Sequence, residues 1–166
     1  MPGPIRKYLM SDHDRLNGLM ERSVRQPGVI EQAAYDQFRS GLLRRIGMEE
    51  KILLPFARKA RGGDPLPAAD RLKRDHAALA ALLVPTPTPT IMEIIQSILL
   101  EHNPLEEGPD GIYGACERLA GSDAATLAAQ LESTPDVRVA PHYDTPLVAE
   151  HIERLLMLRR PDSAQS

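Results

Sequence analysis

Apolar residues recur every three or four positions along most of the chain, which is the spacing of an amphipathic α-helix. Alternating apolar and polar stretches bounded by turn residues, which would indicate strands, are hard to find. The pattern therefore predicts an all-α protein, with helices over about residues 5–24, 30–60, 68–83, 91–106, 112–119, 122–131 and 145–158.

Prolines and capping residues mark where the predicted helices begin and bend. Pro55 lies inside the second helix and predicts a kink there. Thr90 with Glu93 three residues later is a capping-box pattern, so the fourth helix is expected to start directly after Thr90. Ser122 is a candidate cap for a short alanine-rich helix, and the Thr145-Pro146 pair is a good start for the last helix.

The first four predicted helices are long and their connections are short, which favours an antiparallel up-down four-helix bundle. We expect residues 1–121 to form this bundle. Residues 122–166 are expected to form a C-terminal helical extension that packs on the bundle and ends in a frayed tail. The proline-threonine repeat at 85–90 predicts a rigid, extended connector, with a ligand for a proline-recognition domain as the alternative.

Composition excludes several classes of function. The formal net charge is −3 over 166 residues, so there is no basic excess for binding a nucleic-acid backbone. Cys116 is the only cysteine and cannot form an internal disulfide, which fits a reducing compartment. No apolar run approaches the roughly 20 residues that a membrane span requires. The sequence therefore predicts a cytoplasmic protein with neither a nucleic-acid nor a membrane partner.

Six ionisable residues lie on the apolar stripes of the four long helices, where they are expected to face the interior. They are His13, Arg45, Glu49, His76, His102 and Glu106. A carboxylate buried without a partner costs several kcal/mol, and a shared cation removes that penalty. Imidazole and carboxylate together are a ligand set for iron, manganese or zinc. The pattern therefore predicts a metal site at His13, Glu49, His76, His102 and Glu106.

The order of these residues resembles the hemerythrin-like HHE cation-binding domain family over about residues 5–120. The residues that carry the resemblance are His13 in Ser11-Asp12-His13-Asp14, Glu49-Glu50 followed by Leu53-Leu54-Pro55, His76 in Arg74-Asp75-His76, and His102-Asn103-Pro104-Leu105-Glu106-Glu107. The resemblance implies a four-helix bundle with a carboxylate-bridged di-iron centre. It also implies binding of dioxygen or related diatomic molecules, or a response to iron or redox state.

Arg45 departs from the family pattern, which has a histidine four residues before Glu49. The resemblance implies one metal ion at His76 and His102, a second at His13 and the missing histidine, and bridging carboxylates from the two glutamates. Arginine has no free lone pair and carries a fixed charge, so it cannot replace a histidine ligand. We therefore expect at most one tightly bound metal ion per chain, and an ion pair of Arg45 with Glu49.

Other interpretations of the same residues stay open. Each inward histidine could be a hydrogen-bonded core residue, and Glu49 could serve only as the partner of Arg45. Glu50 and Glu107 are expected to be solvated, although Glu50 could reach the edge of the site. His142 and His151 lie outside the pattern and are expected at the surface. Pro104 lies between His102 and Glu106 and should distort the helix there.

Three functions are compatible with this pattern. The first is a metal-binding protein, with iron as the expected ion, that binds or senses diatomic molecules, iron or redox state. The second is a degenerate bundle without metal that acts as an interaction or regulatory module. The third, an oxidase or reductase, ranks last because no nucleophile or acid–base pair accompanies the metal set. The sequence leaves homo-oligomer formation open.

Overall fold

The computed structural model describes residues 2–160, and over that range it contains helices and loops but no strand. In chain order the elements are α1 (Pro4–Ser23), α2 (Gln32–Met48), the π-helical segment η1 (Glu49–Leu53), α3 (Leu54–Ala60), α4 (Ala69–Leu82), α5 (Pro89–Glu107), α6 (Ile112–Ala120), the 3₁₀ turn η2 (Gly121–Asp123), α7 (Ala124–Glu132) and α8 (Pro146–Arg159). The predicted all-α class is confirmed. The predicted frayed tail, residues 161–166, lies outside the described residues.

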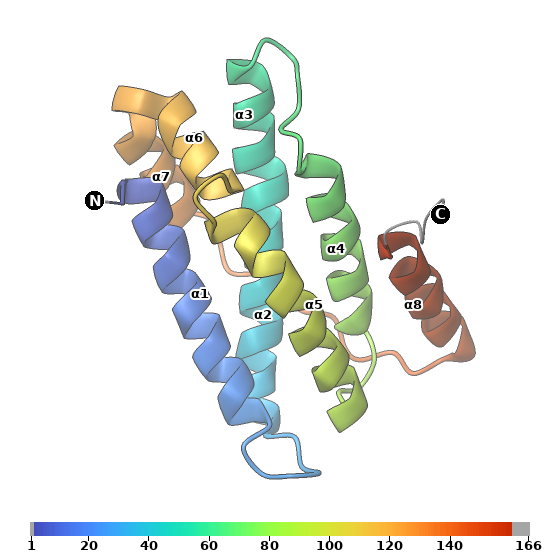
Figure 1. Ribbon diagram of the computed structural model, residues 1–166. Helices are drawn as coiled ribbons and strands as arrows, with labels where there is room; N and C mark the ends of the chain where they lie inside the picture. The colour runs from blue at the N-terminus through green and yellow to red at the C-terminus, as the bar shows by residue number, and fades with distance from the viewer. Residues whose placement is uncertain (1, 161–166) are drawn as a thin grey trace.

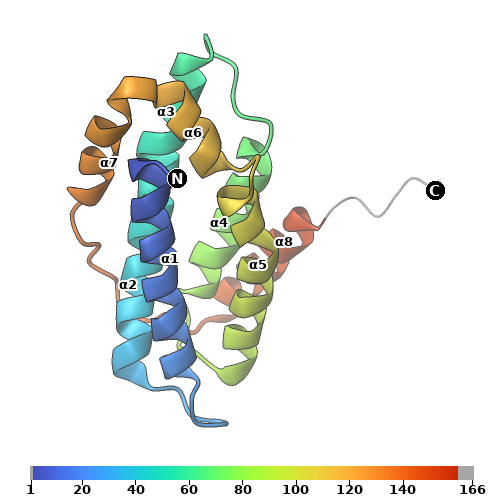
Figure 2. The same cartoon turned by 60° about the vertical axis from the view of Figure 1, so that its left-hand side comes forward.

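The long helices lie side by side along one common direction (Figures 1 and 2). α1 packs along α2, and α4 packs along α5. The segment α2–η1–α3 is one continuous helical rod (Figure 1). α6 and α7 lie at the end of the molecule where α1 begins, and both contact α1. α8 lies on the side of the molecule away from α7, against α4 (Figure 2).

Two predicted helix starts are wrong. Thr88, not Thr90, caps α5, because its side chain accepts a hydrogen bond from the backbone N–H of Ile91 at 3.2 Å. Pro89 then takes the first helical position, where its fixed φ suits a helix and its missing N–H leaves no donor unpaired. Ser122 lies inside η2 and makes no capping hydrogen bond to α7. Thr145 does cap α8, as predicted, by accepting from Val148.

The two prolines inside helices have different effects. Before Pro55 the chain makes a wide π-helical turn, in which the backbone N–H of Leu54 bonds to the carbonyl of Glu49. The rod therefore adjusts by widening one turn, and the helix continues to Ala60. α5 likewise continues past Pro104 to Glu107. Pro104 does not move His102 and Glu106 out of line, since their side chains form an ion pair.

A layer of buried polar side chains separates two apolar cores. The core at the α6–α7 end includes Leu9, Leu53, Leu72 and Ile112, and the core at the other end includes Leu16, Leu42, Leu79 and Leu99. Each polar residue lies in the chain between a residue of one core and a residue of the other. The members of this polar layer are His13, Arg45, Glu49, His76, His102 and Glu106, all buried. The inward orientation predicted for these six residues is confirmed.

No helix within residues 2–160 is long and apolar enough to cross a lipid bilayer.

Candidate metal centre

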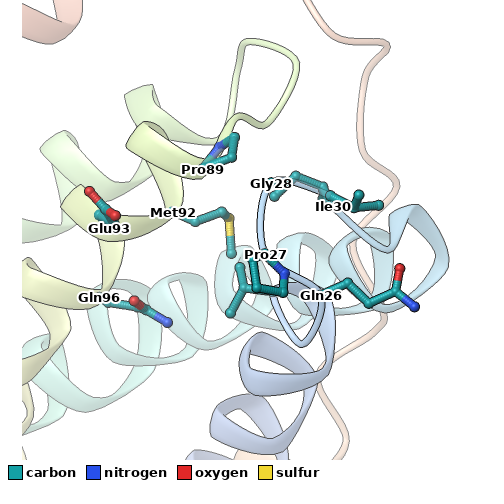
Figure 3. A pocket seen from close by; sticks show the side chains of 10 residues that line it. Gln26, Pro27, Gly28, Ile30, Pro89, Met92, Glu93 and Gln96 are labelled. Atoms are coloured by element: carbon teal, nitrogen blue, oxygen red, sulfur yellow. The ribbon is translucent and has the colours of Figure 1, made fainter.

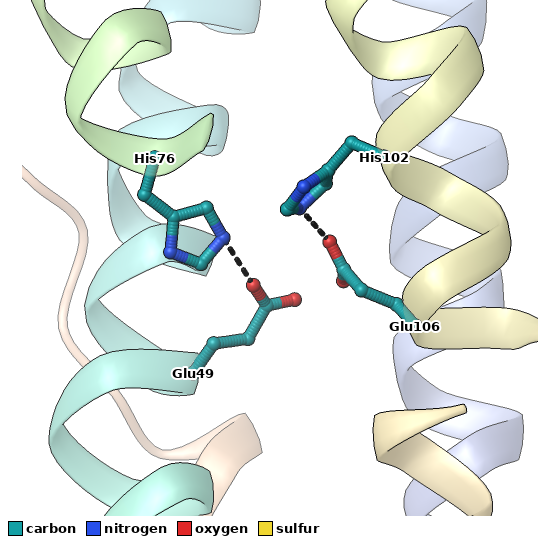
Figure 4. Close-up of side chains that lie close together, drawn as sticks. All are labelled: Glu49, His76, His102 and Glu106. Atoms are coloured by element: carbon teal, nitrogen blue, oxygen red, sulfur yellow. Dashed lines mark ion pairs between the residues drawn. The ribbon is translucent and has the colours of Figure 1, made fainter. Parts of the chain in front are cut away.

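Four of the predicted ligands converge on one point. Ligand atoms of Glu49, His76, His102 and Glu106 all lie within 4.8 Å of one another, and all four side chains are buried. Figure 4 shows them pointing toward a common centre, from the α2–η1 junction, from α4 and from α5. Donors about 2.0–2.2 Å from one ion lie at most a little over 4 Å apart, so small side-chain movements would close this set on a single ion.

The space between these side chains is small. A cavity of about 10 Å³ lies among them, which is about the smallest volume that holds one water molecule. Its walls also include Arg45 and Asn103, and on the apolar side Leu42, Ile46, Leu79 and Leu99. The site therefore has room for one ion and little else.

Both histidines direct Nε2 toward the centre and Nδ1 toward a carboxylate. His76 Nε2 lies 2.9 Å from Glu49 Oε2, and His76 Nδ1 lies 3.5 Å from Glu50 Oε2. His102 Nε2 pairs with Glu106, and His102 Nδ1 lies 2.9 Å from Asp75 Oδ2. A carboxylate behind a histidine fixes its tautomer and ring orientation, which is the usual environment of a metal-binding imidazole. Glu50 thus lies at the edge of the site, as the sequence had left open.

In the metal-free protein these contacts favour the protonated histidines. Burial lowers the pKa of His76, but its contacts with the carboxylates of Glu49 and Glu50 outweigh burial and raise it to about 10. Burial also lowers the pKa of His102, and hydrogen bonds with Asp75 and Glu106 raise it to about 9. Two imidazolium ions therefore balance the carboxylates when no cation is bound. A metal ion would replace their protons.

The second oxygen of each glutamate faces Arg45 and Tyr113 instead. Arg45 Nε lies 3.3 Å from Glu49 Oε1, and Arg45 Nη2 lies 3.8 Å from Glu106 Oε2. The hydroxyl of Tyr113 lies 2.7 Å from Glu49 Oε1 and also contacts Glu106 Oε2. A phenol has one proton to donate, so it donates to one of the two carboxylates and accepts from Arg45, whose Nη2 is 3.1 Å away. The predicted Arg45–Glu49 ion pair is confirmed.

The two carboxylates differ electrostatically. Burial and the neighbouring negative charge of Glu106 raise the pKa of Glu49. Burial also raises the pKa of Glu106, but its hydrogen bond with Glu49 and the charges of Arg45 and His102 outweigh burial and hold it well below its usual range. Burial raises the pKa of Tyr113 well above its usual value, so the phenol stays neutral. Glu106 is therefore the fixed negative charge of the pair.

His13, the fifth predicted ligand, lies on the Arg45 side of the carboxylates. Its Nε2 is 3.0 Å from the hydroxyl of Tyr113 and 3.5 Å from Glu106 Oε2, and its Nδ1 faces Glu107. His13 is not one of the four residues that converge. The structure therefore places Tyr113 and Arg45 with His13, where the resemblance implies the second metal ion.

Sequence reasoning missed three participants. Tyr113 does not stand out in the sequence, but it is fully buried and its hydroxyl contacts both glutamates. Asp75 precedes a predicted ligand by one residue, which is the only signal in the sequence for its contact with His102. Arg159 pairs with Asp75 at 2.9 Å, and nothing in the local pattern of α8 indicated this contact.

The remaining candidates lie elsewhere. His142 Nε2 is 3.4 Å from the side chain of Gln32, and His151 is exposed on α8. Burial raises the pKa of Cys116 to about 12, so its thiol is not activated. A hollow of about 300 Å³ lies between the α1–α2 loop and the start of α5 (Figure 3). Glu93 is the one charged residue in its lining, so this hollow offers no metal ligand set.

Comparison with known proteins adds no relative. The chain matches no protein-family model, and no curated protein or solved structure matches it either.

Proposed function

We propose that the protein binds one transition-metal ion between Glu49, His76, His102 and Glu106, as a hemerythrin-like protein with one of two metal sites replaced. The observation that carries the proposal is the convergence of four buried ligand atoms within 4.8 Å. Two imidazoles and two carboxylates suit iron, manganese and zinc, and the resemblance of the sequence to hemerythrin-like domains favours non-haem iron.

The architecture that accompanies this proposal is an antiparallel up-down four-helix bundle with additional C-terminal helices. Its four members are α1, the rod α2–η1–α3, α4 and α5, each of which contributes a residue to the polar layer. Carboxylates and histidines that project inward from neighbouring helices are a common way for such bundles to hold metal ions. The packing of these helices side by side supports this arrangement (Figure 1).

Charge supports a single ion. Arg45 offsets part of the negative charge of Glu49 and Glu106, and its guanidinium lies on the side opposite His76. One divalent cation more than neutralises what remains. A second cation would meet a fixed positive charge at low dielectric, where like charges repel strongly. The site therefore favours one ion per chain over the di-iron centre that the resemblance implies.

We further propose that the protein is a sensor of iron. It would respond either to whether an iron ion is available to bind or to the redox state of the bound ion. The cavity of about 10 Å³ holds the ion alone, so dioxygen or another diatomic molecule would enter only if wall residues moved. The apolar walls formed by Leu79 and Leu99 would receive such a ligand. The small volume of the cavity thus favours a protein that responds to the bound ion over one that stores a diatomic gas.

Metal analysis of the purified protein tests this function. We expect about one iron ion per chain after anaerobic loading with Fe²⁺ and desalting, with an absorption spectrum of non-haem iron after exposure to air. His76→Gln and His102→Gln should each lose the ion, because each removes a nitrogen ligand. His151→Gln is the matched control, since His151 is exposed on α8, and it should retain the ion.

A metal-free bundle that serves as an interaction module is the alternative function. The observation in its favour is that the protein itself completes the ion pairs, His76 with Glu49 and His102 with Glu106. If wild-type protein binds neither Fe²⁺, Mn²⁺ nor Zn²⁺, this alternative replaces the metal-binding proposal.

A further inference from the structure

One buried carboxylate connects a proposed metal ligand with the C-terminal helix. Asp75 on α4 is 1% exposed, and its two oxygens have different partners. Oδ2 lies 2.9 Å from His102 Nδ1, and Oδ1 lies 2.9 Å from the Nε of Arg159 on α8. Arg159 also reaches Glu101 at 3.0 Å. The three side chains His102, Asp75 and Arg159 form a continuous polar chain from the proposed metal position to α8.

Outside this chain of contacts, α8 packs along α4 through an apolar face that stays partly exposed. It has no buried residue, and its inward side chains Ile152, Leu155 and Leu156 are only half-buried. A mostly apolar groove of about 600 Å³ remains where α8 faces α4 and the start of α5. Residues 134–145, which lead to α8, have no regular secondary structure. Apolar contact along α8 is therefore incomplete, and specific polar contacts add to it.

Those polar contacts lie at the two ends of α8. Just before its first turn, Asp144 accepts hydrogen bonds from the backbone N–H of Thr86 at 2.9 Å and from its hydroxyl at 2.6 Å. In its last turn, Arg159 makes the contact with Asp75. Only the second contact leads to the buried polar layer. The C-terminal end of α8 is therefore the end that can respond to a change at His102.

We infer that Asp75 is a positioning residue for His102, and that metal binding and the docking of α8 through Arg159 strengthen each other. This inference rests on the proposed metal site. A bound ion fixes the ring of His102, which fixes Oδ2 of Asp75 and presents Oδ1 to Arg159. The docked arginine in turn holds Asp75 in the orientation that His102 needs. Coupling between two sites is reciprocal, so each event must favour the other by the same factor.

The inference predicts a graded effect on affinity. Asp75→Asn removes the carboxylate behind His102 and should weaken Co²⁺ binding about ten- to a hundredfold, the usual effect of losing such a partner. Arg159→Gln removes the partner of Asp75 and leaves the partner of His102 in place, so a smaller loss of Co²⁺ affinity, about fivefold, is expected. Arg159→Lys keeps a cation for Asp75 and should recover part of that loss. Arg154→Gln is the matched control, because Arg154 is exposed on the same helix.

The experiment uses the full chain and Co²⁺ alone. Competition titrations measure affinity, and the visible spectrum of bound Co²⁺ reports ligand geometry, which should change in Asp75→Asn and in Arg159→Gln. Amide hydrogen exchange measures the reverse coupling. Addition of Co²⁺ should slow exchange across 146–159 in the wild type and in Arg154→Gln, and this slowing should be absent in Arg159→Gln.

The outcomes separate this inference from the proposed function. If the wild type binds none of Co²⁺, Fe²⁺, Mn²⁺ and Zn²⁺, both fail together. If the wild type binds Co²⁺ but Arg159→Gln binds it equally well or more tightly, with the same spectrum, the metal site stands and the coupling is wrong. Unchanged exchange across α8 on addition of Co²⁺ to the wild type also overturns the coupling. Arg159→Gln keeps the test valid even if Asp75→Asn fails to fold.

Discussion

Arg45 Nε lies 3.3 Å from Oε1 of Glu49, while Oε2 of the same carboxylate faces His76 at 2.9 Å. Glu106 is divided in the same way, with Oε1 toward His102 and Oε2 toward Tyr113 and Arg45. Each carboxylate therefore has one oxygen on the proposed metal side and one on a side that the protein fills with its own donors. This division is the physical basis for expecting one metal ion.

Replacing the arginine should change the metal content. Arg45→His removes the fixed charge and supplies a nitrogen ligand beside His13 and the two glutamates. We expect iron per chain to rise from at most one toward two, measured by elemental analysis after identical anaerobic loading. Equal metal content in both proteins would show that Arg45 does not control a second position.

The phenol of Tyr113 is a second obstacle at that position, since its hydroxyl contacts both carboxylates and donates its one proton to one of them. The double variant Arg45→His/Tyr113→Phe should therefore bind more of the second ion than Arg45→His alone. Tyr143→Phe in the Arg45→His background is the control, because Tyr143 is 63% exposed. Two ions in the wild type would show that the arginine and the phenol together do not prevent double occupancy.

Removing the positive charge without replacing it should destabilise the metal-free protein. Arg45→Met removes one buried cation from Glu49 and Glu106, and breaking a buried ion pair in this way costs about 3–5 kcal/mol. Urea unfolding in the presence of a chelator measures this loss. Added Zn²⁺ should stabilise Arg45→Met by more than it stabilises the wild type, because the ion meets less positive charge.

Arg71→Met controls for the change of residue type, since Arg71 is exposed on α4. A metal-free Arg45→Met variant as stable as the wild type would show that the ion pair of Arg45 with Glu49 contributes nothing to stability.

The hydroxyl of Tyr113 should contribute measurably to stability. Tyr113→Phe keeps the ring that fills the α6 core but removes one hydrogen-bond partner from Arg45, from His13 and from the carboxylates. A loss of about 1–3 kcal/mol in the free energy of unfolding is expected from urea titration in chelator. A loss no larger than that of Tyr143→Phe would mean that the hydroxyl is energetically neutral.

Stability of the metal-free protein should fall as the pH rises. The folded protein raises the pKa of His76 to about 10 and that of His102 to about 9, from an ordinary value of 6.5. Between pH 6.5 and these raised pKa values, the folded state binds more protons than the unfolded state. The stabilisation by the two protonated histidines is therefore fully present below pH 6.5. It is lost as the pH rises through 9 and 10. Urea midpoints at pH 6, 8 and 9.5 in chelator should decrease in that order.

Metal affinity should follow the opposite direction, because the ion competes with the protons of both imidazoles. Co²⁺ affinity should increase from pH 6 to pH 9. The double variant His76→Gln/His102→Gln should lose the pH dependence of stability, because both titrating imidazoles are removed. An apparent Co²⁺ affinity that stays flat between pH 6 and 9 would mean that the histidines are already neutral in the metal-free protein.

The sequence predicted the helices and the inward phase of the six polar residues because both follow from local spacing. His102 and Glu106 share one face of one helix, and Arg45 and Glu49 share another, so their pairing needs no knowledge of the fold. Convergence of Glu49 with His76 required only that neighbouring helices face each other. The helix starts were less certain, since Thr88 and Thr90 both precede a helical stripe, and the proline after Thr88 decides between them.

Contacts between distant segments could not be predicted in this way. Tyr113 lies 100 residues from His13 in sequence, and Asp75 lies 84 residues from Arg159. The apolar side chains around Tyr113 made it resemble any core aromatic residue. Because α8 buries none of its residues, its apolar pattern did not indicate which way Arg159 faces. Only the packing of α6 and α8 on the long helices brings these groups to the polar layer.

Complete burial of the four converging side chains also limits how fast a metal ion can enter or leave the site. Each is at most 2% exposed, and Leu42, Ile46, Leu79 and Leu99 line the apolar side of the cavity between them. An ion can then enter or leave only when the helices open locally, and such openings occur far more slowly than diffusion. Loading should therefore proceed at a rate that stops rising with metal concentration and equals the opening rate of α4 and α5. Once seated, the ion would be retained through washing even at modest equilibrium affinity.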